Sequence, residues 1–219
     1  MDSAVIIPPA TMRHHLQNPV STPFNGRYTS ARHQYLLKAE DMTIAGLYGG
    51  TLTNIAVQFQ PHLQDIVYRN VKIALKCTDE ARLEPGRGFD GDMVPVFSAD
   101  SVVIPPQGGW ITFPFYPMYN RDTARNLLIE FCYTNDTLTP PAYTFYFEGD
   151  YPATLYAFSQ TDNLCGNLPA AQRTYVNHQI PLMRLGYALA PEIDFKYRWH
   201  NSIFQPSAVW IGFLGAARC

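Results

Sequence analysis

Apolar and polar residues alternate in short runs along most of this chain. Thr53–Gln60 (TNIAVQFQ) places an apolar residue at every second position, and Val71–Cys77 (VKIALKC) repeats the pattern. A period of two is typical of a half-buried β-strand. Further runs with strand character are Val94–Phe97, Ser101–Ile104, Gly109–Phe115, Leu127–Tyr133, Tyr143–Phe147, Thr154–Phe158 and Leu182–Tyr187.

Turn-forming residues separate these runs at the spacing of a β-sandwich or barrel. They include Gly49-Gly50, Pro105-Pro106, Gly108-Gly109 and Pro140-Pro141. Helix is expected only over Lys38–Gly46, where apolar residues share one face and the glycine can cap the end. We therefore predict an all-β fold: a single antiparallel β-sandwich, jelly-roll-like, with one short helix.

Proline content and a break near the C-terminus divide the chain into three parts. Residues 1–23 are expected to form an extended Pro-rich arm, and residues 24–187 the β-sandwich module. After the break at Ala190-Pro191, the pattern stays compatible with strands. Residues 188–219 are thus either closing strands or the start of a following segment.

Composition excludes several classes of protein. The 219 residues carry 16 Lys+Arg and 18 Asp+Glu, a net charge of −2, and the few cations are scattered, which argues against a nucleic-acid partner. Hydrophobic residues make up 47% and aromatic residues 14%, too much apolar surface for intrinsic disorder. Apolar stretches are shorter than the roughly 18 residues that span a bilayer, so no membrane insertion is expected. The N-terminus has no basic region typical of a signal peptide, so the protein is cytosolic or a signal has been removed.

Motifs for catalysis are missing from the sequence. There is no HExxH, no Gly-x-Ser-x-Gly and no glycine-rich phosphate loop, so no enzymatic activity is predicted. A hydrolase with a dispersed carboxylate pair, Glu130 with Glu148, is an alternative. It requires the two carboxylates to lie roughly 5–9.5 Å apart, as in glycosidases. The strand pattern instead points Glu130 outward, between Ile129 and Phe131.

Asp90 and Asp92 lie two residues apart in the glycine-rich segment Glu84–Asp92 (EPGRGFDGD). Such carboxylates can supply oxygen ligands to Ca²⁺, although the rest of an EF-hand is missing. The alternative is a solvated turn that uses Asp and Gly for their backbone geometry. Apart from this Ca²⁺ hypothesis, no cofactor is expected.

The many aromatic residues admit two interpretations. Exposed rings in a row would stack on sugars, whereas buried rings would fill the core between two sheets. The candidates for a glycan-binding platform are Trp110, Tyr116, Tyr119 and Tyr146, with Tyr143, Tyr151 and Tyr156 as further members.

The four cysteines are Cys77, Cys132, Cys165 and Cys219, and none belongs to a CxxC pair. They are either buried thiols or, in a secreted domain, members of two disulfides with three possible pairings.

The order of the strand motifs resembles a module of secreted and surface proteins of the Bacteroidota. Its "R-x-Q-Y-L-Y" segment and short "A-E-L…A-G" helix are similar to Ser30–Gly46 (SARHQYLLKAEDMTIAG), and its "N-L-l-v-E-i-C-f-d-N" strand to Asn126–Asn135 (NLLIEFCYTN). The other matches are Gly50–Phe59, Val71–Leu75, Gly109–Pro114, Ala153–Ala157 with Cys165, and Gln179–Gly186. The last departs from the family's "R-P-n-i-R-f", because Gln179 replaces the first arginine. The resemblance covers about residues 20–187.

Such modules are non-catalytic β-sandwiches in adhesins, gliding-associated proteins and multidomain hydrolases exported by type IX secretion. The resemblance therefore implies an extracellular or cell-surface location. It also implies a role in adhesion or interaction, or as a structural spacer, with other domains or surface proteins as partners. The alternative is a carbohydrate-binding module attached to a glycan-degrading enzyme, with glycans as partners. No catalytic residue carries over.

Export also affects the expected covalent chemistry. With Cys132 and Cys165 both inside matching regions, the resemblance implies a disulfide between them. Bacteroidota O-glycosylate exported proteins at Asp-(Ser/Thr)-(small or apolar) triplets. Candidate acceptors in such triplets are Ser101, Thr123 and Thr137.

Overall fold

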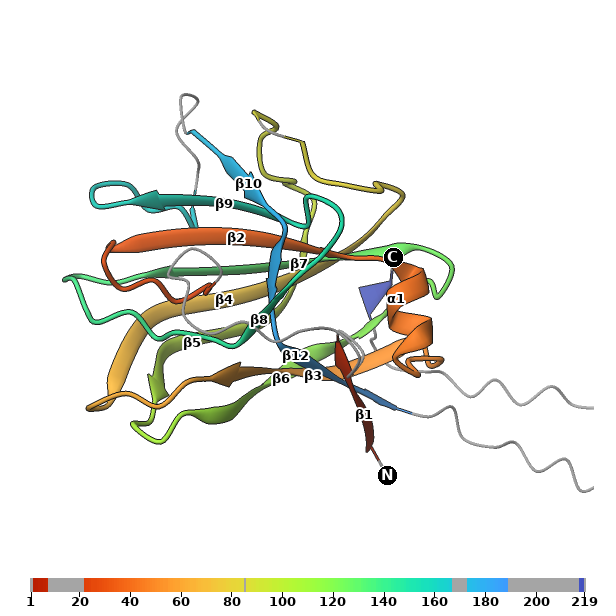
Figure 1. The fold of residues 1–219 in the computed structure, drawn as a ribbon, viewed down its shortest axis with the longest axis horizontal. Helices are drawn as coiled ribbons and strands as arrows, with labels where there is room; N and C mark the ends of the chain where they lie inside the picture. Colours follow the sequence, from red (N-terminus) through yellow and green to blue (C-terminus); the bar gives the residue numbers. More distant parts are fainter. Residues whose placement is uncertain (1, 8–21, 85, 167–172, 189–216, 219) are drawn as a thin grey trace, which may run out of the picture.

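The computed structural model describes residues 2–7, 22–84, 86–166, 173–188 and 217–218 (Figure 1). Thirteen strands and one helix are present in these ranges. In chain order they are β1 (Asp2–Ile7), β2 (Ser30–Leu37), α1 (Ala39–Ile44), β3 (Thr51–Phe59), β4 (Ile66–Thr78), β5 (Val94–Ile104), β6 (Gly109–Asn120), β7 (Asn126–Thr134), β8 (Tyr146–Glu148), β9 (Thr154–Ser159), β10 (Tyr175–Asn177), β11 (Gln179–Pro181), β12 (Met183–Ala188) and β13 (Ala217–Arg218).

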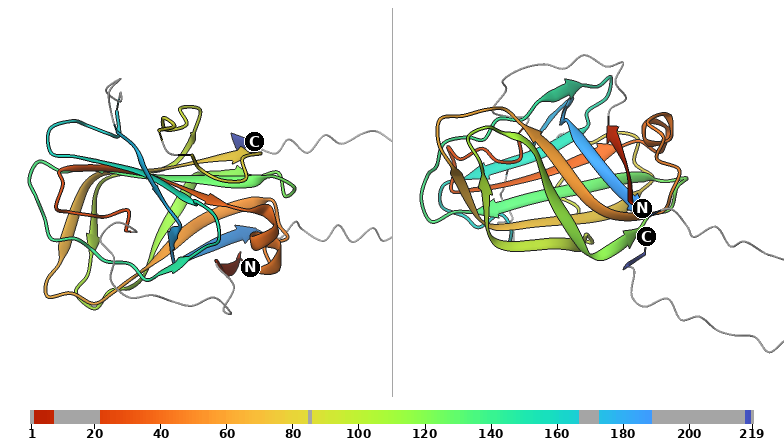
Figure 2. Two further views of the ribbon diagram at one scale, coloured as in Figure 1. Left: turned by 45° about the horizontal axis from the view of Figure 1, so that its top comes forward. Right: turned by 90° about the horizontal axis from the view of Figure 1, so that it is seen from below.

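The described strands form two large sheets and one small one. The six-stranded sheet has the order β10-β9-β2-β7-β4-β5, and the five-stranded sheet has the order β1-β12-β3-β6-β13. Strands β11 and β8 form a separate pair. Neighbours are antiparallel except β13, which runs parallel to β6. Figure 2 shows the two large sheets as facing layers. The prediction of an all-β sandwich with one short helix is confirmed.

Several strands differ in extent from their sequence patterns. Val94–Phe97 and Ser101–Ile104 belong to one strand, β5, because the residues between them continue the pairing with β4. Strand β2 lacks a clear alternation, since all eight of its residues are buried. A strand covered on both faces loses the period-two signal.

A cluster of large aromatic rings fills the space between the two sheets. Phe24 has the rings of five other residues around it: Phe59, Tyr68, Phe113, Phe131 and Tyr133. All six are almost completely buried. Core filling therefore accounts for much of the aromatic content of the sequence.

The two ends of the chain contribute strands to the five-stranded sheet. Residues 2–7 form the edge strand β1, paired with β12, so this part of the predicted arm belongs to the sandwich. Residues 8–21 lie outside the described residues. Of the predicted C-terminal part, Ala188 ends β12 and Ala217–Arg218 form β13, whereas residues 189–216 and 219 are also outside the described set. Within the described ranges, no helix has the length and apolarity that a membrane crossing requires.

Candidate functional site

A groove of about 410 Å³ lies where strand β7 separates from strand β4. One wall is formed by Asp65, which directly precedes β4, and by Val67 and Arg69 at the start of β4. The other wall is the segment 135–139, which follows β7 directly. The groove is therefore positioned by two central strands of the six-stranded sheet that part at this end.

Asn70 explains why β4 changes direction here. Its φ of 51° lies in the left-handed region, which asparagine adopts more readily than most residues. Its side-chain amide donates to the carbonyl of Thr134, the last residue of β7. Tyr68 and Val71 are both buried although they are three positions apart, so the strand's inward face switches at this residue. The kink fixes the point at which β4 and β7 diverge.

Asn135 connects the two walls of the groove. Its Oδ1 accepts a hydrogen bond of 2.7 Å from the backbone N–H of Arg69. Because only the carbonyl oxygen of the amide can accept this bond, the orientation of the amide is fixed. The Nδ2 donor has no hydrogen-bond partner within the described ranges, although the residue is only 7% exposed. Buried donors are nearly always satisfied, so this one marks a position where an acceptor fits.

The rest of the lining combines charge, hydroxyls and apolar groups. The Arg69 Nε atom lies 3.9 Å from the Asp136 carboxylate, in a solvent-exposed pair that contributes little stability. Asp65 supplies a second exposed carboxylate, so the groove carries one net negative charge. Exposed Val67 and Leu138 offer apolar contact. Among the described residues, no aromatic side chain lines the groove.

The Ca²⁺ hypothesis for Asp90 and Asp92 is not supported, because cations of the protein itself occupy Asp90. Its carboxylate accepts hydrogen bonds from Lys76 Nζ at 2.7 Å and from Arg87 at 3.4 Å. Burial opposes ionisation of Asp90, but these contacts hold its pKa below the usual range. Asp92 is almost fully exposed. The described residues contain no cluster of three or more His, Cys, Asp or Glu side chains that could hold a metal ion.

Asp90 instead anchors the segment between β4 and β5 onto the six-stranded sheet. Its backbone carbonyl accepts hydrogen bonds from Gln34 and Arg32 of β2, and its backbone N–H donates to Gln34 Oε1. The Arg32 guanidinium also lies over the ring of Phe89, 4.9 Å from its centre. These contacts cover the outer face of the sheet at β2 and β7.

Glu130 lies beneath this segment and is buried. Its carboxylate accepts hydrogen bonds from Arg32 Nε at 2.8 Å and Gln34 Nε2 at 2.7 Å. Burial raises the pKa of Glu130, an effect that the neighbouring Arg32 charge partly offsets. Glu130 points away from the core, as the strand pattern predicts, but it is buried under the segment that Asp90 anchors. Glu148 is exposed on β8, in a different sheet, and the carboxylate of Glu130 already accepts two hydrogen bonds. These positions do not support the alternative of a hydrolase that uses the two carboxylates.

Two of the four leading candidates for a glycan-binding platform are buried, which contradicts the alternative of a row of sugar-stacking rings at these positions. Tyr119 is fully buried and Tyr146 is only 8% exposed. One face of the Trp110 ring is covered by Arg184, whose guanidinium lies 4.3 Å from the ring centre. Tyr116 is 93% exposed. Of the further candidates, Tyr151 is buried, while Tyr143 and Tyr156 are half-buried.

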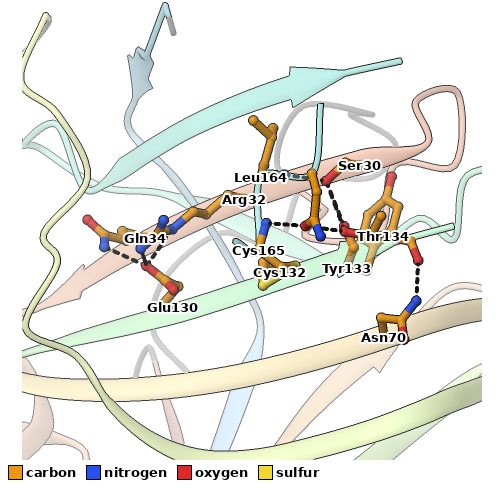
Figure 3. The surroundings of a disulfide bond; sticks show 11 residues. Ser30, Arg32, Gln34, Asn70, Glu130, Cys132, Tyr133, Thr134, Leu164 and Cys165 are labelled. Atoms are coloured by element: carbon orange, nitrogen blue, oxygen red, sulfur yellow. Dashed lines mark hydrogen bonds and ion pairs between the residues drawn. A yellow bond between two sulfur atoms is a disulfide. The ribbon is translucent and has the colours of Figure 1, made fainter. Parts of the chain in front are cut away.

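Figure 3 shows the disulfide between Cys132 and Cys165, the pair expected from the resemblance. It links the central strand β7 to the loop after β9. The backbone N–H of Leu164 donates to Ser30 Oγ, and Thr134 Oγ1 donates to Asn163 Oδ1. The loop is therefore held against the sheet by one covalent bond and several hydrogen bonds. Cys77 is disulfide-bonded as well.

All three candidate O-glycosylation acceptors lie on the surface. Ser101 is exposed on β5, while Thr123 and Thr137 are exposed in connecting segments. Thr137 also lines the groove.

No protein-family model matches the chain, and no curated protein matches it in sequence.

The groove could not be predicted from the sequence. Asp65, Val67 and Arg69 follow the period of a strand, and Asn135 ends a strand-like run, but both features are common in β-proteins. Residues 65–69 and 135–139 become neighbours only because β4 and β7 pair across the middle of the sheet.

Proposed function

We propose that this chain is a non-catalytic β-sandwich module of a secreted or cell-surface protein that acts in adhesion or molecular interaction. The observation that carries the proposal is the groove at the β4–β7 divergence, where the Nδ2 donor of Asn135 has no hydrogen-bond partner among the described residues. Binding residues on loops that a rigid sheet positions are common in interaction domains. A purely structural spacer would not require this donor.

The engagement of the buried carboxylate supports a role without catalysis. The Glu130 carboxylate accepts hydrogen bonds from Arg32 and Gln34 and lies beneath the loop that Asp90 anchors. A general acid or base must reach substrate, directly or through one water. Glu130 serves instead to join strands and loop.

The disulfide supports a location outside the cytosol. Disulfides persist in oxidising compartments and are rare in cytosolic proteins of mesophiles. Cys132–Cys165 and the bonded Cys77 agree with an exported protein. Together with the motif order that resembles modules of the Bacteroidota, they support export by type IX secretion.

Burial of the rings weighs against the carbohydrate-binding alternative. Tyr119 and Tyr146 are not available for stacking, and Arg184 occupies one face of Trp110. The described residues that line the groove include no aromatic ring. A protein or peptide partner fits this site better than a glycan does.

Parallel binding and turnover assays test the proposal. The purified chain is screened against a glycan array and a phage-displayed library of random peptides. It is also incubated with fluorogenic glycosides, esters and peptides. We expect selective binding in one screen and no turnover above that of boiled protein. Turnover that is lost in Glu130→Gln would contradict a non-catalytic role, and no binding in either screen would leave only the spacer role.

A further inference from the structure

We infer that the groove accepts an extended peptide segment with a basic side chain, which pairs with the start of β4 as an additional strand. The inference rests on the proposed interaction function and specifies the class of partner. Three features of the described residues carry it: a strand edge without a neighbour, the direction of the backbone groups on that edge, and the charge around it.

The first feature is the edge of β4 that β7 leaves uncovered. Pairing with β7 begins at Lys72, whereas pairing with β5 on the other side begins at Ile66. Within the part of the chain that the structure describes, residues 66–69 therefore pair with a strand on one side only. Among the described segments, no backbone–backbone hydrogen bond joins Asp65 or Val67 to residues 135–139. An unpaired edge of this kind is a template for strand addition.

The second feature is the direction of the backbone groups. The N–H of Arg69 points to the groove, because it donates to Asn135 Oδ1. Along a strand, the N–H and C=O groups of alternate residues point to the same edge. Val67 therefore presents its N–H and C=O groups to the groove, between Arg69 and Asp65. These three residues are also the ones from this strand that line it.

The side chain of Asn135 occupies the position that the backbone of an added strand would have beside Arg69. Its Oδ1 accepts the Arg69 N–H as the carbonyl of a neighbouring strand would. Its Nδ2 donor is buried and has no hydrogen-bond partner among the residues that the structure describes. A peptide entering beside Val67 would supply a carbonyl oxygen for this donor and continue the ladder toward Asp65.

The third feature is the composition of the walls. The carboxylates of Asp65 and Asp136 outnumber the single guanidinium of Arg69, which favours a basic side chain in the partner. Val67 and Leu138 offer apolar contact to its other side chains. Without a ring to stack on, a sugar would lose the contact that usually anchors it, whereas an extended peptide gains main-chain hydrogen bonds.

The test uses a phage-displayed library of random 12-residue peptides, selected on the wild-type chain and counter-selected on Val67→Pro. Proline removes the N–H that faces the groove, and it is tolerated at an unpaired strand edge. Val67→Thr keeps the N–H and the branched shape and serves as the matched control. We expect selected peptides to carry Lys or Arg, to bind wild type and Val67→Thr alike, and to bind Val67→Pro at least tenfold more weakly.

A second measurement needs no protein variant, so the test survives if Val67→Pro does not fold. Synthetic copies of one selected peptide carry backbone N-methyl groups at either the odd or the even positions. Because only alternate N–H groups of an added strand face β4, we expect one copy to lose at least tenfold in affinity and the other to keep most of it. The backbone amide signals of Val67 and Arg69 and the Asn135 side-chain amide should shift in NMR spectra on binding.

Equal loss from both methylated copies, or binding that Val67→Pro leaves unchanged, would overturn strand addition while leaving the interaction role intact. Glycan binding that shifts the same groove signals would show a sugar site instead and would also overturn it. Failure to select any peptide, with no glycan binding either, would contradict the proposed interaction function as well.

Discussion

The side-chain oxygen of Asn135 accepts a 2.7 Å hydrogen bond from the backbone N–H of Arg69 at the point where β7 leaves β4. A side chain thereby replaces the carbonyl that a continuing strand would supply. The bond holds segment 135–139 beside β4 and fixes the orientation of the Nδ2 donor, which no described residue satisfies. The stability of this corner of the sandwich and the shape of the groove consequently depend on the same residue.

Replacing Asn135 with Ala should weaken the fold locally. Loss of the acceptor leaves the Arg69 N–H without its partner, which should lower the free energy of unfolding by about 1 kcal/mol. Urea unfolding measures this change, and amide hydrogen exchange should show faster exchange at Arg69. The exposed neighbouring variant Thr137→Ala is the control and should change neither quantity. Unchanged exchange at Arg69 in Asn135→Ala would contradict the bond.

Arg32→Ala should destabilise the protein in a pH-dependent manner. Burial raises the pKa of Glu130 in the folded state, so the folded state holds the proton more tightly than the unfolded chain does. Ionisation of Glu130 therefore costs stability as the pH rises through and above its unfolded pKa of about 4.3. Arg32 offsets that cost, and removing it should lower the free energy of unfolding by roughly 3–5 kcal/mol at pH 7 and by clearly less at pH 4.

Urea unfolding at the two pH values checks this expectation. The double variant Arg32→Met with Glu130→Leu is the matched control, because replacing both partners of a buried ion pair with apolar residues is often neutral. It should recover most of the stability at pH 7 and show no extra loss between pH 4 and pH 7. A deficit in Arg32→Ala that is equal at both pH values would show that lost packing, for example against Phe89, is the main cause.

Removing the disulfide with Cys132→Ala and Cys165→Ala should lower the free energy of unfolding by about 3–4 kcal/mol. The expected size follows from the sequence separation of 33 residues, since a crosslink restricts the unfolded chain more as the closed loop lengthens. Urea unfolding of the oxidised wild type and the double variant measures the difference. Peptide maps with and without reductant should first show a Cys132–Cys165 peptide, and free thiols at both positions would contradict the pairing.

Thr123 and Thr137 should carry glycans when the protein is isolated from its native source, if it is exported as proposed. Both side chains are exposed in connecting segments, where a transferase can reach them. Ser101 is exposed but lies within β5, so lower occupancy is expected there. Glycopeptide mass spectrometry measures each site. Unmodified peptides at all three positions would remove this support for export.

Secondary structure could be predicted where a local sequence pattern specifies it. The burial and contacts of residues that depend on pairing between distant strands could not be predicted. The alternation in β3 and β4 was enough to predict both strands, and Gly46, with a φ of 94°, follows the short helix as expected. Strand β2 escaped detection by periodicity because both of its faces are covered. Tyr119 and Tyr116 looked equivalent in sequence, yet one is buried and the other almost fully exposed.

The sequence by itself determined that this protein is an all-β sandwich, because the period of its apolar residues and the positions of its turns are local properties. Its near-neutral charge likewise argued against a nucleic-acid partner without reference to any fold. Only the tertiary structure decided which carboxylates are engaged and where a partner can bind. Asp90 contacts Lys76, and Asn135 contacts Arg69, because distant strands pair and loops fold over them. These contacts depend on the whole sheet and not on residues that are neighbours in the sequence.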